Sequence, residues 1–363
     1  MQLCARSAGR CQFDGCNQNL FVEGLTFASG YFGEIAHNVA SSAGGPRGDK
    51  KRSPELSDDV NNLMLLCHEH HKLVDDNPEV YTEAVLREMK SNHERKISIC
   101  CESIGKEPTE VIRFQSPIKG SYRVSINPQQ ATEAIITRFR PASERGQAII
   151  IQPLCDYNTA EYWQQADTEL TKRVQLVRDT ILSDNPNQHF SVFPIAPIPL
   201  IAKLGYLMGD KIRCEVYQKF REPDTWKWLT EDQTNHFPVQ KCIIREGNKI
   251  ALVLSLTDDI GISRVTSVFN ADMIISIRAE HTGVTCIKSR KDLACFWETY
   301  QAVCNEITNT IPGVSKIAVF PAVPVAAAFS IGYRYMPGVY PEMILFEENN
   351  GFVETISFGG EHR

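Results

Sequence analysis

The chain has 363 residues and a mass of 40.8 kDa, more than one hydrophobic core usually supports, so we expect at least two domains. Its formal charge of −6 at pH 7 excludes a global positive field, and any contact with nucleic acid must therefore be local. No apolar run approaches the roughly 18–20 residues that cross a bilayer, and the first residues lack the apolar core of a signal peptide. We expect a cytoplasmic protein without a membrane partner.

The first hundred residues are rich in cysteine, with six of the 12 cysteines in the first 101 positions. In a chain of this size without a secretion signal, such cysteines are typical of metal ligands and buried thiols rather than of disulfides. The region predicts short strands at 26–32 and 34–39, a Gly/Pro loop at 41–48 and an amphipathic helix at 78–101. It carries 11 Lys and Arg against 14 Asp and Glu, and its best local basic run is 47–52.

Beyond a predicted linker at 101–120, strand and helix patterns alternate, which favours α/β layers with a largely parallel sheet. The predicted strands lie at 147–154, 190–194, 212–218, 249–256, 273–278, 317–320 and 343–346. The predicted helices lie at 160–182, 291–310 and 323–331.

Two stretches of this second region repeat each other at an offset of 127 residues. The sequence SVFPIAP at 191–197 matches AVFPAVP at 318–324, and Gly205-Tyr206 matches Gly332-Tyr333. We interpret them as two fused copies of one α/β unit, with unrelated strands that end in similar Pro-rich turns as the alternative. Open α/β sheets bind ligands at the carboxyl ends of their strands, so paired copies would suit a nearly two-fold ligand such as a cyclic dinucleotide or oligonucleotide.

Four residues near the N-terminus have the types and spacing of structural zinc ligands. Cys11 and Cys16 form one pair, and Cys67 and His70 form a second pair with two residues between them. Structural zinc takes four Cys or His ligands, usually from two such pairs. The rival ligands are Cys4, His68 and His71. An accidental cluster of cysteine and histidine is the alternative.

Three further residues, His37, Asn62 and His71, are interleaved with these pairs and have side chains that phosphodiester hydrolysis uses. His37 suits a general base, because imidazole exchanges a proton near neutral pH. Asn62 would orient that imidazole or coordinate a cation through its carbonyl oxygen, and His71 would bind the catalytic metal. Taken singly, they have structural interpretations as a core histidine, a helix cap and a surface residue. Their order around the zinc pairs favours the catalytic interpretation.

These residues resemble the zinc-containing HNH endonucleases with their ββα-metal fold. The resemblance covers about residues 1–95 and is carried by Cys-x4-Cys, the run EIAHN at 34–38 and the run 61–72. It implies His37 as the general base, Asn62 and His71 around a Mg²⁺ or similar cation, and a structural Zn²⁺ at the two pairs above. Position 36, often an Asp that binds the cation in this family, is Ala36 here. The missing ligand must come from elsewhere, with Glu34 as a candidate.

The duplicated half is similar to the SAVED sensor domain, a fusion of two CARF-like, Rossmann-like α/β units. The resemblances predict an HNH domain at 1–100, the linker at 101–120 and a SAVED domain at 121–363, with pseudo-repeats at about 145–245 and 246–363. The expected fold class is thus a multidomain combination of a small zinc-stabilised α+β domain and α/β units. This is the architecture of effector endonucleases in CBASS anti-phage systems.

The same resemblance implies activation by a cyclic dinucleotide or oligonucleotide that a cGAS/DncV-like nucleotidyltransferase makes. Ligand binding would drive self-association to a dimer or up to a tetramer, and the HNH units would then degrade double-stranded DNA in abortive anti-phage defence. Two alternatives stay open. One is an HNH restriction-type nuclease that no nucleotide gates, and the other is a non-catalytic zinc-module adaptor on a nucleotide sensor.

Candidate ligand contacts lie in loops after predicted strands and near the repeated Phe-Pro turns, because bases stack on aromatic or guanidinium faces and phosphates bind cations. They are Asp156, Tyr157, Trp163, Lys203, Tyr206, Asp258, His281, Tyr333 and Arg334. The aromatic members equally suit packing roles, and Asp258 suits a helix cap. The sequence does not choose among these contacts.

Overall fold

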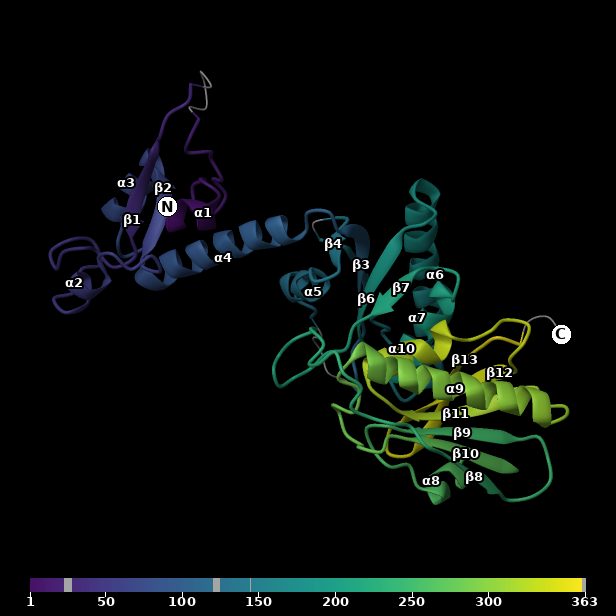
Figure 1. The fold of residues 1–363 in the computed structure, drawn as a ribbon. Coiled ribbons are helices and arrows are strands. Elements are labelled where there is room, and N and C mark those ends of the chain that lie inside the picture. The colour runs from purple at the N-terminus through teal and green to yellow at the C-terminus, as the bar shows by residue number, and fades with distance from the viewer. Residues whose placement is uncertain (23–27, 120–124, 144, 361–363) are drawn as a thin grey trace. The chain divides into compact units, whose positions relative to one another are not determined.

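The computed structural model describes residues 1–22, 28–119, 125–143 and 145–360. The chain divides into two compact units, Met1–Gly105 and Lys106–Arg363 (Figure 1). Among the described helices, none is both long enough and apolar enough to cross a bilayer. The division confirms the expectation of a multidomain chain.

The first unit is built around a two-stranded antiparallel sheet. β1 (Gly33–His37) pairs with β2 (Leu63–Cys67), and the register places His37 opposite Leu63. α3 (His68–Asp76) follows β2 directly. His37 and Cys67 lie at opposite ends of this strand pair, and α3 starts at the Cys67 end. The later residues His71 and Asp75 of α3 line one pocket with His37.

Three helices complete the first unit: α1 (Gln2–Ser7), α2 (Arg52–Leu56) and α4 (Glu83–Glu102). α4 confirms the helix predicted at 78–101 but begins later, because the Thr82 side chain caps it by accepting a hydrogen bond from the Val85 amide. Among the described residues, the connected hydrophobic cluster of the unit contains only ten buried apolar side chains. A core this small provides little hydrophobic stabilisation, so the unit needs a further source of stability.

The strand predicted at 26–32 is not confirmed as a regular strand. Its first two residues lie outside the described ones, and residues 28–32 contain only the isolated bridge between Ser29 and Val22. The strand predicted at 34–39 is present as β1, shifted by one or two residues.

The second unit contains two sheets. In the first sheet the strand order is β4-β3-β6-β7, β5 also pairs with β3, and all of these pairings are parallel. The strands are β3 (Glu107–Gln115), β4 (Phe139–Pro141), β5 (Gln147–Ile150), β6 (His189–Ile195) and β7 (Cys214–Val216). The accompanying helices are α5 (Pro128–Ile135), α6 (Ala160–Asp184) and α7 (Ile198–Met208).

The second sheet has the order β13-β12-β11-β9-β10-β8, with parallel pairing in the middle and antiparallel pairing at both edges. Its strands are β8 (Val239–Ile243), β9 (Ile250–Ser255), β10 (Met273–Arg278), β11 (Lys316–Ala322), β12 (Glu342–Glu348) and β13 (Phe352–Phe358). Its helices are α8 (Ile262–Thr266), α9 (Arg290–Thr310) and α10 (Val325–Tyr333). The elements predicted beyond residue 146 are all present, with ends shifted by a few residues.

α7 and α10, which follow the two matching Phe-Pro stretches of the sequence, pack side by side where the two sheets meet (Figure 1). A Cβ atom on Gly332 would lie 1.9 Å from the carbonyl oxygen of Ala202, and one on Gly205 would lie 2.1 Å from that of Phe329. The equivalent glycines of the two repeats thus let the two backbones touch. One continuous core joins both sheets around this crossing.

We expect Gly332→Ala to destabilise the second unit, because the new methyl group would force the two helices apart in a core without free space. Overpacking of about 3 kcal/mol should lower the melting temperature by roughly 5–10 °C in calorimetry. Gly261→Ala is the control, because the nearest atom to its Cβ would lie 3.9 Å away. Equal melting temperatures for the two variants would contradict the close crossing.

The structure corrects the predicted domain boundaries. Residues 101–120 are not a linker, because Glu107–Gln115 form β3, which pairs with three strands of the first sheet. The first repeat therefore begins near β3 and not at 145. β8 pairs with β10, so the second repeat begins near Val239 and not at 246.

Candidate functional sites

Cys11, Cys16, Cys67 and His70 form a compact cluster in the first unit. Their four ligand atoms all lie within 4.8 Å of one another. Sγ of Cys67, the last residue of β2, is 3.0 Å from Nδ1 of His70 in the first turn of α3. Phe13 stacks on the His70 ring with 4.0 Å between ring centroids, which holds the plane of the imidazole.

This donor set fits zinc. Ligand atoms at about 2.0–2.3 Å from a tetrahedral zinc ion lie roughly 3.3–3.8 Å from one another. The distance between Cys11 Sγ and His70 Nδ1 is 3.8 Å. Three thiols and one imidazole also match the softness of the metal. Among the described residues, this cluster does not include the rival ligands Cys4, His68 and His71.

His37, His71 and Asp75 line one small pocket of about 210 Å³ beside the cluster. Nε2 of His37 lies 3.2 Å from the carbonyl oxygen of Ser57. Because a carbonyl oxygen only accepts, Nε2 carries the hydrogen of the neutral ring and Nδ1 keeps its lone pair. The hydrogen bond therefore favours the tautomer of His37 in which Nδ1 is free to take a proton from water.

Glu34 on β1 holds the ring of His71. Its Oε2 lies 3.2 Å from Nδ1 of His71, and its other carboxylate oxygen pairs with Nδ1 of His68. The nearby carboxylate favours a proton on Nδ1 of His71, which leaves the lone pair of the neutral ring on Nε2. Metal-binding histidines usually donate their second N–H in this way. Glu34 thus suits a positioning role for His71.

Asp75 is the acidic residue that lines the same pocket. It lies one turn after His71 on α3, with its Oδ2 4.0 Å from Nδ1 of His71. Ala36, in contrast, is 1% exposed and belongs to the core. A carboxylate therefore reaches the pocket from the helix, although none is present at position 36 of the strand.

Asn62 does not line this pocket and is fully buried. Its Oδ1 accepts a hydrogen bond from the Val39 amide at 2.9 Å, and its Nδ2 donates to the carbonyl oxygens of Val39 at 2.8 Å and Leu56 at 3.1 Å. These bonds tie the chain after His37 to the chain before β2. The geometry favours a structural role for Asn62 over coordination of a cation or a direct bond to His37.

Arg47 contacts residues of the pocket through a side chain that is only 6% exposed. It donates to the carbonyl oxygens of His37 and Val74 and pairs with Asp75 at 2.8 Å. The first residue of the basic run 47–52 is therefore structural. Arg52 of that run pairs with Glu83.

In the second unit, the nine predicted ligand contacts lie in separate places. Asp156 and Tyr157 line a pocket of about 680 Å³ at the carboxyl ends of β3 and β5. The Tyr157 hydroxyl donates to Glu347 at 3.0 Å. Burial raises the pKa of the Glu347 carboxyl to about 7. This pocket occupies the edge of the sheet where a ligand was expected.

Three other predicted contacts have packing partners. Trp163 is 2% exposed and belongs to the core. Lys203 pairs with Asp167 at 2.9 Å, and Tyr206 stacks on Phe358 with 4.9 Å between ring centroids.

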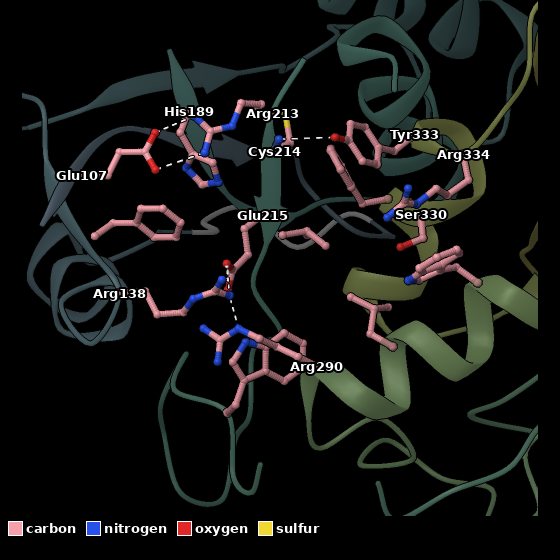
Figure 2. A pocket seen from close by; sticks show the side chains of 16 residues that line it. Glu107, Arg138, His189, Arg213, Cys214, Glu215, Arg290, Ser330, Tyr333 and Arg334 are labelled. Carbon is pink, nitrogen blue, oxygen red and sulfur yellow. Dashed lines mark hydrogen bonds and ion pairs between the residues drawn. The ribbon is translucent and has the colours of Figure 1, made fainter. Parts of the chain in front are cut away.

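Asp258 and His281 are exposed in the loops that follow β9 and β10. Neither residue lines the pocket of Asp156 and Tyr157 or the pocket drawn in Figure 2. Only Tyr333 and Arg334 lie in the pocket of Figure 2.

The pocket of Figure 2, here called the arginine pocket, has a volume of about 580 Å³ and is formed by both repeats. The first repeat contributes Glu107, Arg138, Phe139, His189, Arg213, Cys214, Glu215 and Val216. The loop before β8 and the second repeat contribute Trp228, Arg290, Leu293, Trp297, Phe329, Ser330, Tyr333 and Arg334.

The arginine pocket is positively charged in an acidic chain. Its four arginines and two glutamates give a formal charge of +2, against −6 for the whole chain. Burial, with a smaller contribution from Arg213, lowers the pKa of His189 to about 4, so this histidine is neutral at pH 7. Arg213 forms two contacts with Glu107, at 2.5 and 3.1 Å. Glu215 is shared by Arg138 at 2.8 Å and Arg290 at 2.7 Å.

The position of the arginine pocket differs from the expected ligand position. Glu107 and His189 are the first residues of β3 and β6, so the pocket lies at the amino ends of these parallel strands and not at their carboxyl ends. Sequence reasoning missed its arginines and tryptophans because they come from separate elements and share no spacing. The single pointer was the Tyr333-Arg334 pair after the repeated turn.

Comparison with known proteins identifies the second unit. The family model of the SAVED domain, described as "SMODS-associated and fused to various effectors sensor domain", matches residues 174–358, just over half of the chain. No curated protein matches the chain.

The chain also aligns with solved structures at low sequence identity. The Acinetobacter baumannii Cap4 SAVED/CARF-domain containing receptor with the cyclic trinucleotide 2′3′3′-cAAA is 13% identical with a TM-score of 0.47, covering 85% of this chain and 66% of that one. The Moraxella osloensis Cap4 receptor is 10% identical with a TM-score of 0.43, covering 79% and 60%. The chain thus spans two thirds or less of the length of these receptors. On the match of the family model, the chain belongs to the SAVED sensor-domain family.

Proposed function

We propose that the protein is a cyclic-nucleotide-activated, metal-dependent DNA endonuclease of a CBASS-type anti-phage system. The observation that carries the proposal is the pocket of His37, His71 and Asp75 on a ββα unit, beside a Cys3His cluster, in a chain that also contains a SAVED sensor domain. The sensor family supports the control of the activity by a ligand. The pocket supports phosphodiester hydrolysis as the output.

The side chains of the pocket suit hydrolysis by a water molecule. His37 would take a proton from the attacking water through Nδ1, since Nε2 is held by Ser57. Nε2 of His71 and the carboxylate of Asp75 would hold a Mg²⁺ or similar divalent cation. When bound, such a cation stabilises negative charge on the phosphate and on the leaving oxygen. The residues present therefore fit the cation, with Asp75 in place of the residue missing at position 36.

The charge of the first unit suggests why a ligand is needed. With 11 basic against 14 acidic residues in the first hundred, a single unit has little long-range attraction for DNA. Several weak sites in one assembly would bind DNA far more tightly than one, because each later contact is intramolecular. Ligand-driven self-association would thus convert a poor DNA binder into a nuclease that meets both strands.

The test is degradation of plasmid DNA by the purified full chain with Mg²⁺, in a screen of cyclic dinucleotides and cyclic trinucleotides. We expect cleavage only when one of these nucleotides and Mg²⁺ are both present, together with an increase in mass in light scattering. Equal cleavage by a monomer without nucleotide would favour the ungated restriction-type nuclease. No cleavage with any nucleotide or divalent metal would favour the zinc-module adaptor, which Ala36 keeps open as a second candidate.

A further inference from the structure

The loop at 41–48 turns one arginine towards the interior of the first unit. Arg47 has a backbone φ of 59°, in the left-handed region that a residue with a side chain rarely adopts. A Cβ atom on the next residue, Gly48, would lie 2.5 Å from the carbonyl oxygen of Ser42, so the loop is folded tightly on itself there. Backbone strain of this kind persists only where the surrounding contacts of the residue compensate for it.

Four hydrogen bonds from the Arg47 guanidinium join the two segments that supply the polar groups of the His37 pocket. On the side of β1, Nη2 donates to the carbonyl oxygen of His37 at 3.3 Å and Nε donates to that of Asn38 at 3.1 Å. On α3, Nη1 donates to the carbonyl oxygen of Val74 at 2.7 Å and Nη2 donates to Oδ1 of Asp75 at 2.8 Å. One buried side chain therefore holds both the segment of the base and the segment of a cation ligand.

The ion pair with Arg47 gives the two oxygens of the Asp75 carboxylate different surroundings. Oδ1 lies 2.8 Å from Nη2 of Arg47, whereas Oδ2 lies 4.0 Å from Nδ1 of His71. A divalent cation beside Oδ1 would meet the positive guanidinium at close range, and the repulsion between like charges is strong where water is partly excluded. Asp75 is therefore left with one oxygen, Oδ2, for a cation.

A carboxylate that is limited to one oxygen discriminates between divalent cations. Mg²⁺ requires a nearly ideal octahedron and keeps several waters, whereas Ca²⁺ takes roughly six to eight oxygens and often uses both oxygens of one carboxylate. Mn²⁺ also accepts octahedral coordination by oxygen and should behave like Mg²⁺. An Asp75 that offers only Oδ2 thus suits the ions that need one oxygen from each ligand.

We propose that Arg47 is a positioning residue that makes the pocket selective for Mg²⁺ or Mn²⁺ over Ca²⁺, because it restricts Asp75 to one free oxygen. The inference rests on the proposed function, since it takes His71 and Asp75 as the cation ligands. It deepens that function, because the same guanidinium also fixes the end of β1 that carries His37. Arg47 thus acts on the reaction through Asp75 and His37, without a contact of its own with the cation.

The test measures the binding of cations and needs no DNA. Free Mn²⁺ gives an electron paramagnetic resonance signal that is lost on binding, so a titration of the purified, zinc-loaded full chain counts the Mn²⁺ sites. Displacement of Mn²⁺ by Mg²⁺ or Ca²⁺ then gives the Kd of each ion. His71→Ala identifies the site, because it removes one of the proposed ligands. We expect the wild type to bind Mg²⁺ more tightly than Ca²⁺ at the site that this variant loses.

Arg47→Gln should lower the ratio of the Ca²⁺ Kd to the Mg²⁺ Kd by about tenfold, since it frees Oδ1 of Asp75 for a second bond to Ca²⁺. The loss of one positive charge acts on both divalent ions alike and cancels in this ratio. Arg52→Gln is the matched control, because Arg52 forms an ion pair with Glu83 at 2.6 Å and neither residue lines the pocket. Its ratio should equal that of the wild type.

The outcomes separate this inference from the proposed function. An unchanged ratio in Arg47→Gln that has kept its zinc and its melting temperature would overturn the role of Arg47 and leave the cation site in place. A wild type that binds Ca²⁺ at least as tightly as Mg²⁺ would overturn it whether or not that variant folds. The expected ratios in a protein that cleaves no DNA would keep the inference and remove the nuclease. Mn²⁺ binding that His71→Ala leaves intact would remove the cation site and the inference together.

Discussion

His37→Gln should slow nucleotide-triggered DNA cleavage by about 10²–10⁴-fold, the usual contribution of a general base. Glutamine can still donate a hydrogen bond to the Ser57 carbonyl oxygen, so the loop after β1 should keep its place, but an amide cannot take a proton from water. The measurement is the initial rate of plasmid cleavage at saturating activator and Mg²⁺, with the melting temperature recorded for both proteins.

His93→Gln provides the comparison for this prediction. His93 also bonds to a backbone carbonyl oxygen through Nε2, that of Ser7 at 3.0 Å, but it lies outside the pocket of His37 and His71. Its substitution should leave the rate within about twofold of wild type, because it removes no group from that pocket. Equal losses in the two variants would show that His37 acts through stability and not as a base.

Removal of metal should unfold the first unit and leave the second folded. Structural zinc contributes an apparent ~10–16 kcal/mol to the folding of small zinc domains, and the connected hydrophobic cluster of the first unit has only ten buried apolar side chains among the described residues. We expect one zinc per chain by elemental analysis and, after chelation, rapid proteolysis up to about Gly105 with a protected fragment from the second unit. Circular dichroism should show the matching partial loss of structure.

Cys16→Ser and Cys101→Ser separate zinc binding from other effects of a lost thiol. Cys16 belongs to the cluster, whereas Cys101 is exposed on α4 in the same unit. Only the first variant should lose zinc and become protease-sensitive. A metal-free chain with the same protease resistance as the wild type would contradict a structural zinc.

The sequence predicted the cluster well because zinc chemistry is local. Two short pairs, Cys11 with Cys16 and Cys67 with His70, carry nearly all of the information, and the metal geometry leaves few other arrangements. The repeat was also visible, since Gly205 and Gly332 meet at a crossing that no larger residue permits. In both cases, a strict steric or coordination requirement limits which residue types can occupy a few closely spaced positions.

Other features depend on contacts between distant parts of the chain. The sequence predicts a linker where β3 lies, because the run Glu107–Gln115 mixes Pro, Glu and Arg with its apolar residues, although neighbouring strands bury most of it. The arginine pocket draws residues from Glu107 to Arg334, which no spacing relates. Asn62 resembled a site residue, but its two amide atoms are used by backbone groups of Val39 and Leu56.

The two helices that cross at Gly205 and Gly332 differ in their surroundings, because Phe358 of β13 stacks on Tyr206 of α7 whereas Tyr333 of α10 lines the arginine pocket. If the two repeats are also unequal in ligand binding, and the proposed activator binds one site per chain, its occupancy would rise with a Hill coefficient of about 1. Any steeper dose–response of DNA cleavage must then arise between chains, through their association. The activator concentration at which cleavage begins would accordingly fall as the cell makes more of the protein. The amount of protein in the cell would therefore set the sensitivity of cleavage to the activator.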